Sequence, residues 1–181
     1  MADRANLWGW LGRVVLWVVP CFALWYYVGR LADPLSGRLA VGFINMVGSG
    51  VIETVETGAS QLTFVTRLPV GGGGVLTVDA DSRIYSYGVP FAMALILAAW
   101  PRGIAWRLAL VVVTLFPLVA WGVTFDVLGT LVRAAPGWTA AVLGQWGATG
   151  VAIGYQFGSL IFPGLIPAAV AVGLSWQKLG R

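Results

Sequence analysis

Four apolar stretches alternate with two more polar loops along the chain. The apolar stretches cover residues 13–29, 84–100, 108–124 and 150–174, and the loops cover residues 30–83 and 125–149. A helix needs about 20 predominantly apolar residues to cross the hydrocarbon core of a bilayer, and about 17 is the lower limit. The pattern therefore predicts an α-helical membrane protein, with four transmembrane helices in a single integral domain, residues 1–181.

The hydrophobic period changes within the first loop. Apolar residues recur at helical spacing over residues 34–48, which predicts a short helix lying at the membrane interface. Over residues 51–81 the period becomes two, with turn-forming residues between three short runs. We expect a three-stranded antiparallel β-meander here, with Leu62, Phe64 and Leu68 on its apolar face. So small a sheet is barely stable alone, so that face is expected to rest on the membrane or on a partner.

The second loop, residues 125–149, predicts one or two short amphipathic helices that break at Pro136-Gly137. Asp126 closes the third apolar stretch, and Arg133 follows two helical turns later on the same face. A carboxylate at membrane depth is a functional candidate by default because its burial in lipid is costly. A structural ion pair or a helix-end anchor is the alternative to a role in proton transfer or catalysis.

Gly150, Gly154 and Gly158 form a GxxxGxxxG ridge at the start of the fourth apolar stretch. Small residues at every fourth position let another helix approach closely. That helix could belong to this chain or to a partner, and the spacing leaves both possibilities open. Tyr85 and Tyr87, at the start of the second stretch, are typical of the aromatic belt at a membrane interface.

Composition points to lipid as the main solvent and excludes several kinds of chemistry. The chain is 59% hydrophobic and 10% charged, whereas soluble domains are about 45–50% apolar and about 25% charged. The net charge is +4 without a Lys/Arg-rich run, so we expect no nucleic-acid partner. The chain has no histidine, which excludes Ser-His-Asp and Cys-His catalysis and His-ligated metals. We therefore expect no catalytic residue, no cofactor and no metal.

Basic residues predict the orientation. The short link between the second and third stretches contains Arg102 and Arg107, and the positive-inside rule places such a link in the cytoplasm. With four spans, both termini then lie in the cytoplasm as well. The longer loops, including the β-meander, are expected outside the membrane.

Five segments, in order along the chain, resemble one family: CFALWYY, VTRL, RIYSYGVPFAMALILA, WGVTFDVLGTL and AIGYQFGSLIFPGLIP. Over nearly its whole length the chain is similar to the small membrane proteins called exosortase H-associated. This resemblance implies a Gram-negative inner-membrane protein encoded alongside an exosortase, which is a multi-span transpeptidase-like enzyme that processes exported proteins with a C-terminal sorting signal. Exosortases look to depend on Cys, Arg and His, so this chain resembles the accessory rather than the enzyme.

The expected function is a non-catalytic accessory or scaffold that presents its outer β-module to the enzyme or to its substrate. The expected partners are the lipid bilayer, an exosortase-type membrane protease and its sorting-signal substrates. Partner contacts are expected at the following residues: Leu62, Phe64, Leu68, Tyr85, Tyr87, Gly150, Gly154 and Gly158.

Two other classes of function remain open. A small transporter or channel subunit needs polar groups at mid-membrane, and the apolar stretches offer little beyond Thr114, Gln156 and Ser159. An intramembrane enzyme without histidine could be built on Asp126 and Arg133, and it requires these two residues to converge in a water-filled cleft.

Overall fold

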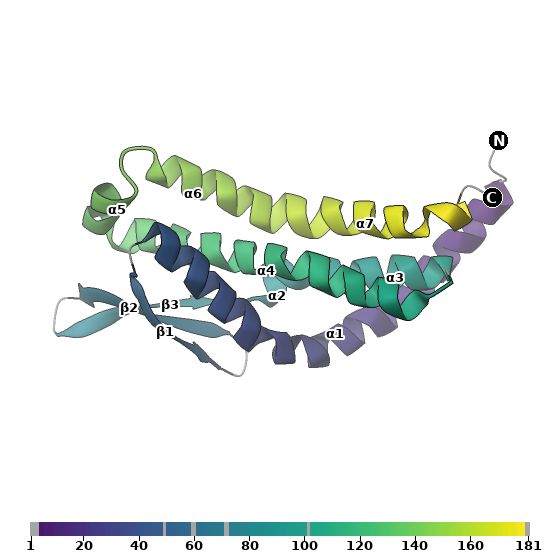
Figure 1. Cartoon of the computed structure of the whole chain (residues 1–181), viewed down its shortest axis with the longest axis horizontal. Coiled ribbons are helices and arrows are strands. Elements are labelled where there is room, and N and C mark those ends of the chain that lie inside the picture. Colours follow the sequence, from purple (N-terminus) through teal and green to yellow (C-terminus); the bar gives the residue numbers. More distant parts are fainter. Residues whose placement is uncertain (1–3, 49, 59–60, 71–72, 101, 180–181) are drawn as a thin grey trace.

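The computed structural model of the chain describes residues 4–48, 50–58, 61–70, 73–100 and 102–179. Its elements, in order, are α1 (Arg4–Val47), β1 (Ile52–Thr57), β2 (Leu62–Val70), β3 (Gly74–Ala80), α2 (Arg83–Ser86), α3 (Gly88–Ala99), α4 (Ile104–Ala134), α5 (Pro136–Val142), α6 (Gly147–Gln156), the π-helix η1 (Phe157–Ile161) and α7 (Phe162–Leu179). Figure 1 shows the long helices side by side, with the sheet and α5 at the end opposite both termini.

Within the described residues, three helical segments are long and apolar enough to cross a membrane. They are Trp8–Val47, Ile104–Ala134 and Gly147–Leu174, and they contain the predicted stretches 13–29, 108–124 and 150–174. The second predicted span, residues 84–100, is not confirmed. It folds as α2 and α3, which form an apolar helical segment, Arg83–Ala99, that is shorter than the three candidate spans.

Helix α1 is a single helix of 44 residues, with Pro20 and Pro34 inside it. The region 34–48, predicted as a separate interfacial helix, is therefore its C-terminal part. Proline removes one backbone hydrogen bond and bends a helix without ending it where neighbouring groups compensate. Figure 1 shows α1 following the bundle, bending, and then crossing the sheet. The first span and the interfacial helix are thus continuous.

The predicted three-stranded antiparallel meander is confirmed, with strand order β1-β2-β3. In the central strand, Phe64 lies opposite Val55 of β1 and Val78 of β3. The buried side chains of the sheet pack against α1 and α4 of the same chain. This core, to which Val151 of α6 also belongs, includes Ala40, Ile44, Leu62, Phe64, Val78, Val127, Leu128, Leu131 and Val151. The apolar face of the sheet is therefore covered by the protein's own helices.

Asn45 fastens the end of α1 to the beginning of β1. Its Nδ2 donates to the Ile52 carbonyl at 3.0 Å, and its Oδ1 accepts from the Ile52 N–H at 2.9 Å. These two bonds satisfy the backbone of a buried residue at the edge of the sheet. The sheet is thus attached to α1 through both apolar packing and a pair of hydrogen bonds.

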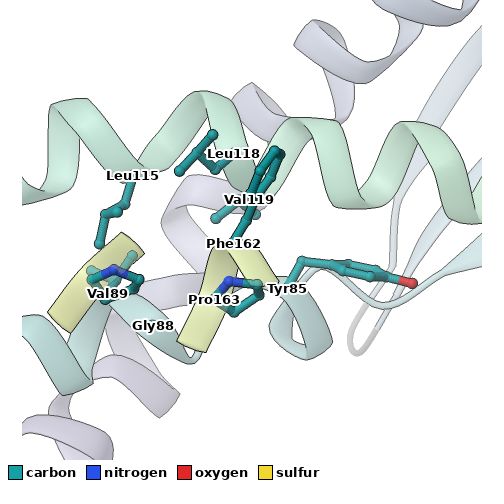
Figure 2. Close-up of a pocket in the computed structure, with 9 residues that line it drawn as sticks. Tyr85, Gly88, Val89, Leu115, Leu118, Val119, Phe162 and Pro163 are labelled. Atoms are coloured by element: carbon teal, nitrogen blue, oxygen red, sulfur yellow. The ribbon is translucent and has the colours of Figure 1, made fainter. Parts of the chain in front are cut away.

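A second core holds α3 between α1, α4 and α7. Its buried residues include Val14, Val89, Ala92, Ile96, Val111, Leu115 and Ala171. Gly88 allows α3 and α7 to touch, because a Cβ at this position would lie 2.5 Å from both the Pro163 carbonyl oxygen and the Pro167 Cγ. Only a cavity of about 10 Å³ remains beside this contact (Figure 2). Helix α3 is therefore a packed core helix.

Helix α4 extends beyond the predicted end of its span. It continues to Ala134, and α5 begins at Pro136, so the chain breaks close to the predicted Pro136-Gly137 position. Proline suits the first position of a helix because its missing N–H would have no intrahelical partner there. Asp126 and Arg133, predicted to lie in a loop, are consequently held by a continuous helix.

Candidate functional site

Tyr85 of α2 links α3 to the polar end of α4. Its side chain is 3% exposed, and its ring occupies the space beside Gly122, where a Cβ would lie 2.4 Å from the ring Cδ1. Figure 2 shows the hydroxyl pointing away from the small apolar cavity. Tyr85 interacts with both the Asp126 carboxylate and Tyr155 of α6, whose ring centroid lies 6.5 Å from that of Tyr85. Glycine at position 122 thus places a buried phenol beside the carboxylate.

Arg133 folds back along α4 toward Asp126. Its Nη2 donates to Thr130 Oγ1 at 3.1 Å, and a Cβ on Gly129 would lie 3.7 Å from Nη1. The guanidinium is therefore about one turn closer to Asp126 than the Arg133 backbone is. Its positive charge acts on the half-buried carboxylate.

Asp126 and Arg133 line the same groove between α4 and α6. The groove has a volume of about 460 Å³, and its lining includes Asp126, Gly129, Arg133, Ala152, Tyr155 and Gln156. Small residues on both helices leave room between them, while one carboxylate, one guanidinium, one amide and one phenol contribute the polar groups. The convergence of Asp126 and Arg133 is one condition of the enzyme alternative raised by the sequence.

The glycine ridge is divided between an internal contact and an open surface. A Cβ on Gly154 would lie 2.1 Å from Phe125 Cε1, and a Cβ on Gly158 would lie 2.8 Å from Gly122 Cα. Trp121 Nε1 of α4 also donates to the Gly154 carbonyl at 3.2 Å. Gly154 and Gly158 therefore bring α6 and η1 against α4 of the same chain. Gly150 is exposed, and a Cβ there would meet nothing within 4 Å.

The proposed contact residues outside the ridge differ in accessibility. Leu62 and Phe64 are fully buried under the chain's own helices, and Leu68 is partly buried. Tyr87 is exposed. In this structure, Leu62 and Phe64 are not available to a partner, whereas Tyr87 and part of Leu68 are.

Sequence reasoning missed the groove, although one signal for it is present. Gly122, Asp126, Gly129 and Arg133 are spaced by four, three and four residues, which places them on one face of a helix. A helix face on which glycines alternate with residues of opposite charge indicates that another segment packs closely beside a polar site. Among the described residues, no group of three or more His, Cys, Asp or Glu side chains could hold a metal ion.

The comparison with protein families gives a match over nearly the whole chain. Residues 4–178 match the family described as exosortase H-associated membrane protein, in agreement with the resemblance carried by the five segments. Neither the comparison with curated proteins nor that with solved structures found a match. The family match extends over almost the entire chain and includes the helices and strands described above, except the last residue of α7. The chain therefore belongs to the family of exosortase H-associated membrane proteins.

Proposed function

We propose that this protein is a non-catalytic accessory of exosortase H that holds the enzyme or its sorting-signal substrate at the outer surface of the inner membrane of a Gram-negative bacterium. Membership of the exosortase H-associated family carries this proposal. The termini and the turn that contains Arg102 would lie in the cytoplasm, and the sheet would lie outside. The start of α1 and the end of α7 lie at one end of the bundle (Figure 1), which supports placing both termini on the same side. This orientation requires the shorter apolar segment Arg83–Ala99 to return the chain across the membrane.

The exposed side of α1 is the surface best suited to a membrane-embedded partner. Its large apolar side chains include Val15, Leu16, Val19, Leu24 and Leu31, all exposed within the chain. Lipid or a helix of the enzyme would cover them. At the outer end, Tyr87, Leu68 and the open Gly150 extend the candidate surface. Leu62 and Phe64 would contribute indirectly, because their burial fixes the sheet on the helices.

Affinity purification tests the partnership. The tagged protein, extracted from native membranes in mild detergent, is expected to retain an exosortase in a fixed ratio, measured by mass spectrometry. Gly150→Leu adds bulk to an open position and is expected to weaken retention if that surface is used. Gly137→Leu is the matched control because a Cβ at Gly137 also meets nothing within 4 Å. Recovery of the wild-type protein without an exosortase would contradict the proposal.

The enzyme alternative has one supporting observation, which is that Asp126 and Arg133 line one groove. It can be separated from the accessory role by inactivating the exosortase instead of this chain. With the exosortase cysteine replaced and the accessory intact, we expect processing of sorting-signal proteins to stop. Continued processing in that strain would assign the chemistry to this chain.

A further inference from the structure

The groove between α4 and α6 combines groups of opposite charge at a spacing that a single small headgroup can bridge. A carboxylate accepts hydrogen bonds from an ammonium, and the planar fork of a guanidinium matches the oxygens of a phosphate. Gly129, over which the Arg133 guanidinium folds, is three residues from Asp126, about 4.5 Å along the helix axis. The two charges therefore suit a ligand whose ammonium and phosphate are separated by a short linker.

The α6 side of the groove belongs to an apolar segment. This segment, Gly147–Leu174, is long and apolar enough to cross a membrane. Ile153, Phe157 and Leu160 are exposed on it, Leu160 by 70%. Acyl chains could lie against these apolar side chains while a polar headgroup occupies the groove.

We propose that this groove binds the headgroup of a zwitterionic phospholipid with a primary ammonium, with the ammonium on Asp126 and the phosphate on Arg133. Phosphatidylethanolamine has this chemistry. The site goes beyond the proposed accessory role, since it would exist whether or not an exosortase is bound. A peptide from water would use the polar groups but would leave the exposed apolar side chains of α6 and η1 uncovered. A lipid accounts for both features.

Lipid retention by the full-length protein provides the test. The protein is reconstituted in nanodiscs with equal amounts of phosphatidylethanolamine, phosphatidylcholine and phosphatidylglycerol with identical acyl chains. Native mass spectrometry then measures which lipids remain bound. We expect retention of phosphatidylethanolamine to exceed that of the other two. Phosphatidylcholine lacks the N–H donors of the ammonium, and phosphatidylglycerol lacks the cation.

Two charge variants assign the contacts. Asp126→Asn is expected to reduce phosphatidylethanolamine retention about tenfold, in the range of one charged hydrogen bond, and to remove the preference over phosphatidylcholine. Arg133→Gln is expected to reduce retention of all three lipids. Glu53→Gln and Arg38→Gln change exposed charges on β1 and α1 and are expected to leave retention unchanged.

A third variant covers the case in which Asp126→Asn fails to fold. Ala152→Leu fills the groove from its exposed α6 side while leaving both charges and the Tyr85 contact in place. It is expected to lower phosphatidylethanolamine retention with unchanged tryptophan fluorescence. Equal retention of the three lipids by the wild type would overturn the proposal, as would full retention by folded Asp126→Asn or Ala152→Leu. Displacement of lipid from the groove by a co-purified peptide would overturn it too and identify a protein contact.

Discussion

The crossing of α4 and η1 at Gly122 and Gly158 gives the sharpest prediction for stability. In Gly158→Ala the new Cβ would begin 2.8 Å from Gly122 Cα and 3.3 Å from Trp121 Cδ1. Non-bonded carbon atoms need about 3.5–4.0 Å, so the two backbones must separate by about 1 Å. A backbone atom cannot rotate away as a side chain can. We therefore expect Gly158→Ala to destabilise the protein.

Gly150→Ala is the matched control, because it makes the same change on the same ridge where a Cβ meets nothing within 4 Å. Replacing a helical glycine by alanine stabilises a helix by about 0.5–1 kcal/mol, and both variants receive a similar gain. Overpacking a close contact costs about 1–3 kcal/mol. The free energy of unfolding should therefore be about 1–3 kcal/mol lower for Gly158→Ala than for Gly150→Ala.

Reversible unfolding in mixed micelles of increasing SDS content, followed by tryptophan fluorescence, measures this difference. Trp121 lies at the crossing and donates to the Gly154 carbonyl, so its emission should report separation of α4 from α6. If Gly158→Ala were as stable as Gly150→Ala, the close internal contact would be refuted. The ridge would then be better explained as a surface for a partner helix.

Three further predictions concern the sheet and the orientation. Asn45→Ala removes the side-chain partners of both the Ile52 N–H and the Ile52 carbonyl. The free energy of unfolding should fall by about 1–3 kcal/mol. Hydrogen exchange at the Ile52 amide should become faster. Phe64 is 0% exposed, so Phe64→Ala should lower the free energy of unfolding, measured with denaturant, by about 3–5 kcal/mol. Val75→Ala, at an exposed position of β3, should change it by no more than about 0.5 kcal/mol. Similar losses in the two variants would argue against burial of the sheet face. Alkaline phosphatase fused to the C-terminus should be inactive and a fluorescent protein fused there should be bright, and the reverse pattern would contradict a cytoplasmic C-terminus.

The features that were predicted correctly from sequence depend on local patterns. Alternation at a period of two, with turn residues between the runs, is sufficient for the meander because neighbouring strands pair through short connections. The length and apolar content of the stretches are sufficient to predict the three candidate spans. The register of Phe64 opposite Val55 and Val78 follows once the strands and turns are in place.

The remaining features depend on contacts between distant segments. Apolar composition is the same for a helix that faces lipid and for one that packs among other helices, so the burial of Ala92 and Ile96 in α3 could not be predicted from the apolar stretch itself. The glycine ridge indicated close approach without identifying the approaching helix. Its partner, Gly122, lies 36 positions from Gly158, and no local pattern joins them.

The continuity of α1 has a consequence for any partner that binds the sheet. A flexible linker between span and sheet would let the sheet adopt many orientations, and a partner would have to select one at an entropic cost. Here one helix runs from the apolar bundle to Val47, and Asn45 bonds it directly to Ile52. The orientation of the sheet relative to the helical bundle is therefore set before any partner arrives, so more of the contact energy remains for affinity.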